Sequence, residues 1–255
     1  MLILLSPAKK QQHGSIDFAS NFTQPQAIAQ IKTLISVLKK QSKSKLAKLM
    51  SVSDKLADLN YSRFQAFDPN TFTLKNSTPA VFAFQGDAYQ TLNVSDFNKK
   101  EIAYLQEHLI ILSGLYGYLR PLDLIQAYRL EMKTALKTEQ AGDLYHFWGD
   151  EITKGINAEL QSHKNKAVIN LASNEYFKAI NAKKLDARIV QIDFKERKDG
   201  TYKTVGIHAK RARGTMTRYL VKNRIDNIDD LKAFSELQYA YSEQHSSDDS
   251  LVFVR

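Results

Sequence analysis

Strand-like and helical segments alternate along this chain, and this alternation is what most constrains its fold. The apolar runs Leu2–Leu5 and Ala167–Leu171 have the length and composition of buried strands. Between them apolar residues recur at helical spacing, as at Ile28, Ile31, Leu34, Ile35 and Leu38. No repeat, low-complexity linker or proline-rich stretch divides the chain. We therefore predict one mixed α/β (α+β) domain over residues 1–255, with a central mixed sheet flanked by helices.

Further elements follow from spacing and from helix-start signals. The stretch from Ser6 to Gln24 is rich in small and polar residues and predicts a long loop. A helix start is expected at Ser51 to Asp54. Helical spacing also predicts helices through Ile102, Leu105 and Leu109, and through Phe147, Ile152, Ile156 and Leu160.

A hairpin is predicted near residue 200. Arg188 to Lys198 and Tyr202 to Arg213 have strand character, and Asp199-Gly200 between them is a strong hairpin signal. Alternation along the second strand would put Arg211 and Arg213 on one face and Lys210 on the other. Thr215 would then cap a helix carrying the exposed bases Arg218 and Lys222.

Several classes of site are disfavoured by composition. With no cysteine, the chain has no disulfide-linked partner, thiolate metal site or iron–sulfur cluster. No two of the six histidines lie three to five residues apart, and Asp143 with His146 is an isolated pair, so we predict no metal site. There is no P-loop and no dinucleotide fingerprint, and we expect no cofactor. No stretch of eighteen apolar residues occurs, and Leu2–Leu5 is too short for a leader, so we expect a cytoplasmic protein without a membrane partner.

Charge is distributed unevenly. The chain has 36 basic and 27 acidic side chains, a net charge of +9. Residues 195 to 224 contain ten basic residues and two acidic ones, and the sign reverses from Ile225 onward. A polyanionic partner is plausible on this ground, although the acidic end could also fold over the basic stretch.

Ser113 to Pro121 contains a glycine pair beside an arginine. Gly114 and Gly117 follow the apolar run Leu109–Leu112 and precede Arg120. Glycine permits close backbone approach and positive φ, so N–H groups here could converge on an anion, with Arg120 adding charge. The alternative is a tight, packed turn.

Polar residues also gather at expected strand ends, namely in Ser6–Lys9, Arg129–Lys133 and Lys210–Arg213. Strand ends often meet at one edge of a sheet, where the cations would build an anion pocket: Lys9, Arg129, Lys133, Lys210 and Arg213. Glu131 could pair with these cations or accept a proton. A strand entering a helix at Ser173 would leave free N–H groups for an anion, or would be a plain helix cap. Trp148 is expected to anchor the core.

A family resemblance extends along nearly the whole chain. Its motifs are the opening MLILLSPAK, Ser53–Leu56, Phe84–Asp87, Leu112–Asp123, Tyr128–Met132, Phe147–Asp150, Asn170–Tyr176 and Ala209–Gly214. In these motifs the chain resembles the YaaA family. The resemblance implies resistance to peroxide stress, limitation of free intracellular iron, and DNA binding through a helix-hairpin-helix element near residues 100–130. Such hairpins usually carry Gly-x-Gly, whereas this chain has Gly114-Leu115-Tyr116-Gly117.

Two functions remain open. The first is a DNA-binding protein of the peroxide stress response that contacts duplex or structured DNA by shape and phosphate, without sequence specificity. The residues expected at that interface are Gly114, Gly117, Arg120, Arg129, Lys133, Lys210, Arg211, Arg213, Arg218 and Lys222. The alternative is an enzyme acting on a phosphorylated or nucleotide-like small molecule in a basic pocket around Lys9, Arg129, Glu131 and Lys210, with Lys9, Glu131 and Ser173 as candidate catalytic residues.

Overall fold

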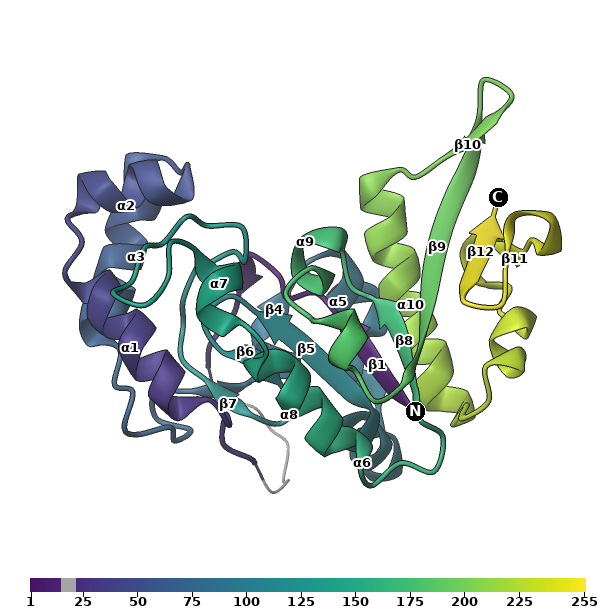
Figure 1. Cartoon of the computed structure of the whole chain (residues 1–255), viewed down its shortest axis with the longest axis horizontal. Helices are drawn as coiled ribbons and strands as arrows, with labels where there is room; N and C mark the ends of the chain where they lie inside the picture. Colours follow the sequence, from purple (N-terminus) through teal and green to yellow (C-terminus); the bar gives the residue numbers. More distant parts are fainter. Residues whose placement is uncertain (15–21) are drawn as a thin grey trace.

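A mixed sheet forms the centre of the molecule (Figure 1). The structure, a computed structural model, describes residues 1–14 and 22–255. In these residues the sheet has eight strands, in the order β11-β12-β9-β8-β1-β5-β6, with β10 paired to β9. Five strands run parallel: β1 (Leu2–Leu5), β5 (Leu109–Ser113), β8 (Ala167–Leu171), β9 (Arg188–Lys198) and β12 (Ser250–Val254). Three are antiparallel to their neighbours: β6 (Gly117–Leu119), β10 (Thr201–Lys203) and β11 (Ala240–Tyr241).

Helices flank this sheet, as Figure 1 shows. They are α1 (Ile28–Lys39), α2 (Lys43–Met50), α3 (Asp54–Ala66), α4 (Ala80–Ala83), α5 (Asp87–Leu92), α6 (Lys99–His108), α7 (Leu144–Trp148), α8 (Glu151–Leu160), α9 (Asn174–Phe177) and α10 (Gly206–Asn223). Short 3-10 turns are η1 (Val94–Asp96), η2 (Ala182–Lys184), η3 (Asp229–Ala233), η4 (Glu236–Gln238) and η5 (Glu243–His245). Two small ribbons pair β2 (Lys10–Gln11) with β4 (Phe84–Gln85) and β3 (Thr78–Pro79) with β7 (Leu124–Ile125).

The middle of the sheet confirms the predicted fold class. Strand β1 pairs with β5 on one side and with β8 on the other, and all residues of these three strands are buried. Parallel strands covered on both faces have continuous apolar sequences rather than alternating ones. This is why Leu2–Leu5 and Ala167–Leu171 were recognisable from the sequence alone.

The segment after the predicted hairpin differs from the expectation. The Asp199-Gly200 turn is present, with both residues at positive φ, but β10 ends at Lys203. The following residues form α10 rather than a continuing strand, so the predicted alternation of Lys210, Arg211 and Arg213 is wrong. Alanine, lysine and arginine favour helix here, and one face buries an apolar stripe at helical spacing: Ala209, Ala212, Met216 and Leu220. Thr215 lies inside this helix and caps nothing.

Other boundaries also shift. Helix α6 ends at His108, and Leu109 begins β5. The helix predicted through Phe147 and Leu160 is divided at Gly149 into α7 and α8. Helix α3 begins at Asp54, while Ser51 ends α2 in a left-handed conformation. The loop predicted from Ser6 to Gln24 is interrupted by β2, and its residues 15–21 lie outside the described part.

Candidate ligand pocket

A cavity lies beside the carboxyl ends of β1 and β8. The chain passes from β1 to β5 on one side of the sheet order, and from β8 to β9 on the other. Ligands of open α/β sheets bind in the crevice at such a topological switch point. The cavity has a volume of about 360 Å³ and is lined by residues at and after the ends of both strands, including Ser6 to Gln11, Leu171 and Ser173. This volume falls within the range of small-molecule sites.

Ser6 ties together the two loops that leave these strands. Its Oγ accepts a hydrogen bond from the backbone N–H of Ser173 at 2.8 Å and lies 3.3 Å from the Ser173 Oγ, to which it donates. The carbonyl of Ser6 accepts a hydrogen bond from the Tyr89 hydroxyl at 2.9 Å. Ser173 therefore precedes α9 as predicted, but its N–H is already used within the protein.

Glu131 lies between two cations in the pocket. Its Oε1 is 3.0 Å from Arg129 Nη2 and 3.4 Å from Lys9 Nζ. The Glu131 side chain is only 9% exposed, whereas that of Lys9 is 64% exposed, so the carboxylate is deep and the lysine lies at the mouth. Of the two roles that the sequence allowed for Glu131, pairing with the cations and accepting a proton, these contacts show the first.

The 129–133 segment is not a strand, contrary to expectation. Arg129 and Glu131 line the pocket, but Lys133 does not. The Lys133 side chain is exposed, and its backbone N–H donates to Glu175 Oε1 at 3.3 Å. The irregular backbone here is set by packing against the glycine turn described below, which no local sequence pattern specifies.

Helix α10 contributes the two remaining cations. Lys210 and Arg213 are three residues apart, so they share a helix face, and both line the cavity. Arg211 is exposed and is not among the lining residues. Burial lowers the pKa of the Arg213 guanidinium, which still carries its charge at neutral pH. In residues 1–14 and 22–255, neither Lys210 nor Arg213 forms an ion pair.

Tyrosine rings form part of the wall. Tyr89, Tyr128 and Tyr176 are buried and line the cavity. The Tyr128 hydroxyl is 2.6 Å from Ser113 Oγ, so its polar end is engaged within the protein, like that of Tyr89. Burial raises the pKa of all three phenols, which stay protonated and present uncharged rings. No pattern in the sequence indicated a role in the pocket for these tyrosines, although Tyr128 directly precedes Arg129.

The glycine pair belongs to a β-hairpin, and the helix-hairpin-helix prediction is wrong. Ser113 pairs with Gly117 across the turn from β5 to β6. A Cβ on Gly114 would lie 2.3 Å from the Leu130 carbonyl oxygen, and one on Gly117, at φ +72°, would lie 2.7 Å from the Trp148 ring. Both glycines are buried, and Trp148, which is 1% exposed, donates its indole N–H to the Gly114 carbonyl at 3.0 Å. The glycines permit close packing, and Trp148 anchors the core as predicted.

Arg120 is engaged within the protein rather than free for an anion. Its Nη2 lies 3.2 Å from Asp123 Oδ1, and the Asp123 side chain is fully buried. The Arg120 backbone N–H donates to the other oxygen of the same carboxylate at 2.8 Å. This arginine closes the turn after β6.

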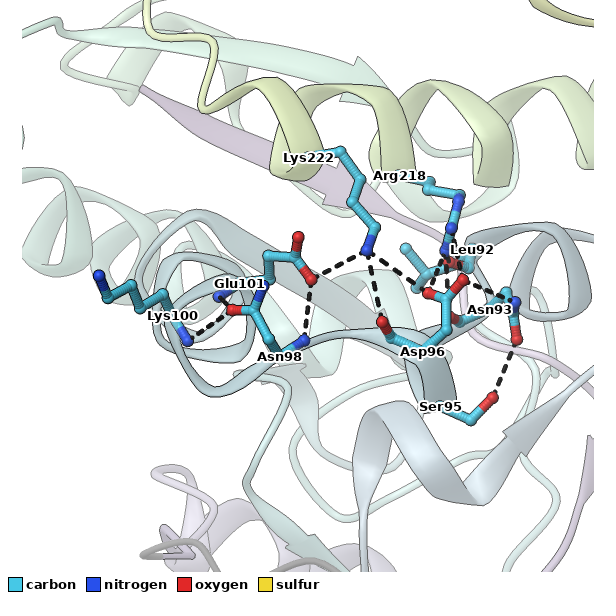
Figure 2. A network of polar contacts seen from close by, with 9 residues as sticks. All are labelled: Leu92, Asn93, Ser95, Asp96, Asn98, Lys100, Glu101, Arg218 and Lys222. Atoms are coloured by element: carbon cyan, nitrogen blue, oxygen red, sulfur yellow. Dashed lines mark hydrogen bonds and ion pairs between the residues drawn. The ribbon is translucent and has the colours of Figure 1, made fainter.

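Arg218 and Lys222 are likewise neutralised, as Figure 2 shows. Arg218 donates through Nη1 and Nη2 to the two oxygens of Asp96, each at 2.6 Å. Lys222 donates to Glu101 Oε2 at 2.9 Å, and both cations lie over the ring of Phe97. They hold the C-terminal half of α10 against η1 and α6, away from the residues that line the pocket.

The Asp96–Arg218 pair is expected to make stability depend on pH. Hydrogen bonds from Arg218 hold the pKa of Asp96 below its ordinary value, so this stabilisation is present above about pH 4 and is lost as the pH falls through the lower folded-state pKa. Because both side chains are partly exposed, Asp96→Asn should cost only about 0.5 kcal/mol at pH 7 and less near pH 2. Urea unfolding at the two pH values measures this, with the exposed Asp230→Asn as control. An equal cost at both pH values would contradict it.

No group of three or more metal-binding side chains occurs in the described part of the chain. Asp143 instead caps α7, where it accepts from the His146 backbone N–H at 2.9 Å and contacts the His146 ring.

Across residues 1–14 and 22–255, no helix combines the length and apolar character needed to cross a membrane.

Comparison with known proteins gives a consistent family match. The profile of the family described as "Peroxide stress protein YaaA" matches residues 1–245. A protein of Francisella philomiragia named "UPF0246 protein" is 48% identical over 256 aligned positions, covering 100% of both chains. Proteins with the same name from Francisella tularensis subsp. tularensis and subsp. novicida are each 46% identical, again over 100% of both chains.

Proposed function

The chain belongs to the peroxide stress protein YaaA family, and from that premise we propose that it serves this response by binding a small phosphorylated molecule in the pocket beside β1 and β8. The observation that carries the proposal is the convergence of Lys9, Arg129, Lys210 and Arg213 on one cavity at the topological switch point. Of the residues that the sequence placed in an anion or small-molecule pocket, Lys133 alone does not line this cavity, whereas these do: Lys9, Arg129, Glu131, Ser173, Lys210 and Arg213.

The charge balance of the cavity supports an anionic ligand. Its lining includes the cations Lys9, Lys10, Arg129, Lys210 and Arg213, and the acids Asp87, Glu131 and Glu175. Glu131 engages Lys9 and Arg129, whereas neither of the two α10 cations forms an ion pair in the described residues, although the Asp193 carboxylate attracts Arg213 electrostatically. Guanidinium and ammonium donors both bind phosphate oxygens through charge-assisted hydrogen bonds.

Ribose 5-phosphate tests this proposal as a simple phosphate ester. We expect isothermal titration to show binding that Arg213→Gln weakens about tenfold or more, since a charge-assisted hydrogen bond is lost. Arg211→Gln is the matched control, because Arg211 lies on the same helix, is exposed and does not line the cavity. Equal effects of the two variants, or no binding by the unaltered protein, would refute the pocket as a phosphate site.

A second candidate function, DNA binding, is favoured by the β9–β10 hairpin. This hairpin projects beyond the body of the molecule (Figure 1) and carries three exposed cations, Arg197, Lys198 and Lys203. Tyr202 between them is 36% exposed. Exposed cations beside an aromatic ring are a common arrangement for contacting phosphates and unpaired bases. We infer that any DNA contact centres on this hairpin rather than on the buried glycine turn or the paired Arg218 and Lys222.

Charge reversal of the hairpin tests the second candidate. Changing Arg197, Lys198 and Lys203 together to glutamate should weaken binding to duplex or bubble DNA at least about tenfold and flatten its salt dependence. The control reverses Lys40, Lys45 and Lys48, which are exposed and lie in or just before α2, a helix far from the hairpin in Figure 1. A similar loss in both triple variants would mean only a general effect of net charge, and the hairpin would have no special role.

A further inference from the structure

Unsatisfied polar atoms concentrate at the pocket. Six buried side-chain nitrogen or oxygen atoms lack a hydrogen-bond partner in residues 1–14 and 22–255, and three belong to residues that line this one cavity. These three are Arg129 Nε, Glu131 Oε1 and Arg213 Nε. Buried polar groups are nearly always paired, so three unpaired atoms around one cavity indicate groups that a ligand completes.

Two of these atoms form a neighbouring donor and acceptor. Arg129 Nε belongs to the guanidinium whose Nη2 lies 3.0 Å from Glu131 Oε1, and that ion pair lacks hydrogen-bond geometry at the carboxylate oxygen. The pair therefore offers one N–H donor beside one carboxylate acceptor. A ligand edge that complements it has an amine hydrogen beside an unprotonated ring nitrogen, as in adenine or cytosine.

The third atom belongs to the other cationic side of the pocket. Arg213 lies with Lys210 on one face of α10, and neither has an ion-pair partner among the described residues. The wall of the same cavity includes the rings of Tyr89, Tyr128 and Tyr176. The hydroxyls of Tyr89 and Tyr128 are engaged by Ser6 and Ser113, so ring surface is what remains for a ligand. Aromatic rings stack favourably on planar bases.

We propose that the ligand is a nucleoside monophosphate whose base bears an amine beside a ring nitrogen, with AMP as the representative compound. The phosphate lies against Lys210 and Arg213, the base packs on the tyrosine rings, and its amine donates to Glu131 Oε1 while Arg129 Nε donates to the ring nitrogen. This inference rests on the proposed function, because it names the molecule that the same pocket takes. The cavity volume of about 360 Å³ suits a ligand of this size.

Titration of the full chain with AMP, IMP and ribose 5-phosphate tests the inference. IMP has the same phosphate and ring size as AMP, but its edge presents a carbonyl oxygen and an N–H in place of the amine and ring nitrogen. We expect AMP to bind about tenfold or more tightly than either of the other two. The edge of IMP does not match Arg129 Nε and Glu131 Oε1, and ribose 5-phosphate has no base, so both compounds leave these buried groups unpaired. Arg213→Gln should weaken the binding of all three compounds, because each of them carries the phosphate.

Glu131→Gln gives a second readout that a merely structural role would not move. A glutamine amide can donate to the IMP carbonyl, so the ratio of AMP to IMP affinity should fall about tenfold in this variant. Lys133→Gln is the control, because Lys133 is nearby, exposed and outside the cavity lining, and it should leave the ratio unchanged.

The outcomes separate the two proposals. If the three compounds bind alike and all depend on Arg213, the nucleobase inference fails while the phosphate pocket stands. If none of the compounds binds, or if their affinities are unchanged by Arg213→Gln, both the phosphate pocket and the nucleobase inference fail. Preference for AMP, dependence on Arg213 and a changed ratio in Glu131→Gln together support the nucleotide assignment.

Discussion

Gly214→Ala is expected to lower the free energy of unfolding by about 3 kcal/mol, one of the largest effects of any single methyl group in this protein. A Cβ at position 214 would lie 1.9 Å from the Ala88 carbonyl oxygen and 2.4 Å from Thr91 Oγ1. The first of these is backbone, so it cannot rotate away, and α10 must move off α5. Thr91 also donates to the Arg211 carbonyl at 2.7 Å, a bond that the same movement would break.

Gly206→Ala is the matched control for this prediction. It lies in the same helix, and a Cβ there meets nothing within 4 Å. Helix propensity alone then acts, and the stability should change by no more than about 1 kcal/mol. Urea unfolding of both variants measures the difference. Equal effects of the two variants on stability would show that α10 and α5 tolerate separation at Gly214.

Trp148→Ala should destabilise the protein by about 4 kcal/mol, at the level of other buried aromatic truncations. Trp148 is 1% exposed, its ring fills the space against Gly117, and its indole N–H bonds to the Gly114 carbonyl. Removing the ring leaves a cavity and also leaves that buried carbonyl without this donor. The turn lies against Leu130 and Glu131, so the variant should also weaken ligand binding.

Two further variants separate the causes. Trp148→Phe keeps an aromatic ring but loses the N–H donor, so its free energy of unfolding should lie between those of the alanine variant and the native chain. Phe147→Ala removes the neighbouring, partly exposed ring and should cost less than Trp148→Ala. Thermal or urea unfolding provides the measurement. A Phe147 effect as large as that of Trp148 would argue against a special role for the contact with the glycine turn.

The pocket was only partly accessible to sequence reasoning. Lys9 and Ser173 follow buried strands whose apolar character is local, so their meeting at one sheet edge could be anticipated. Lys210 and Arg213 were expected at the pocket, but on opposite faces of a strand. They line it together because helical spacing brings residues three apart to one side. The tyrosine wall had no comparable signal, because Tyr89, Tyr128 and Tyr176 come from distant segments.

The basic stretch shows the same limit for surface charge. The sequence from Lys195 to Arg224 contains an excess of cations, but composition does not distinguish the cations that form ion pairs from those that do not. Arg218 and Lys222 meet Asp96 and Glu101, which lie more than a hundred residues earlier in the chain. Arg197, Lys198 and Lys203 stay exposed because their hairpin projects from the sheet.

The sequence by itself determined the fold class, the buried central strands, the Asp199-Gly200 hairpin turn and the family, because each depends on short-range pattern or on motifs read in order. Only the tertiary structure decided that the glycine pair is a packed β-turn, that Arg120, Arg218 and Lys222 are neutralised, and which side chains surround one cavity. The physical reason is that burial and ion pairing depend on which distant segments come into contact, and the local spacing of residues does not specify those contacts.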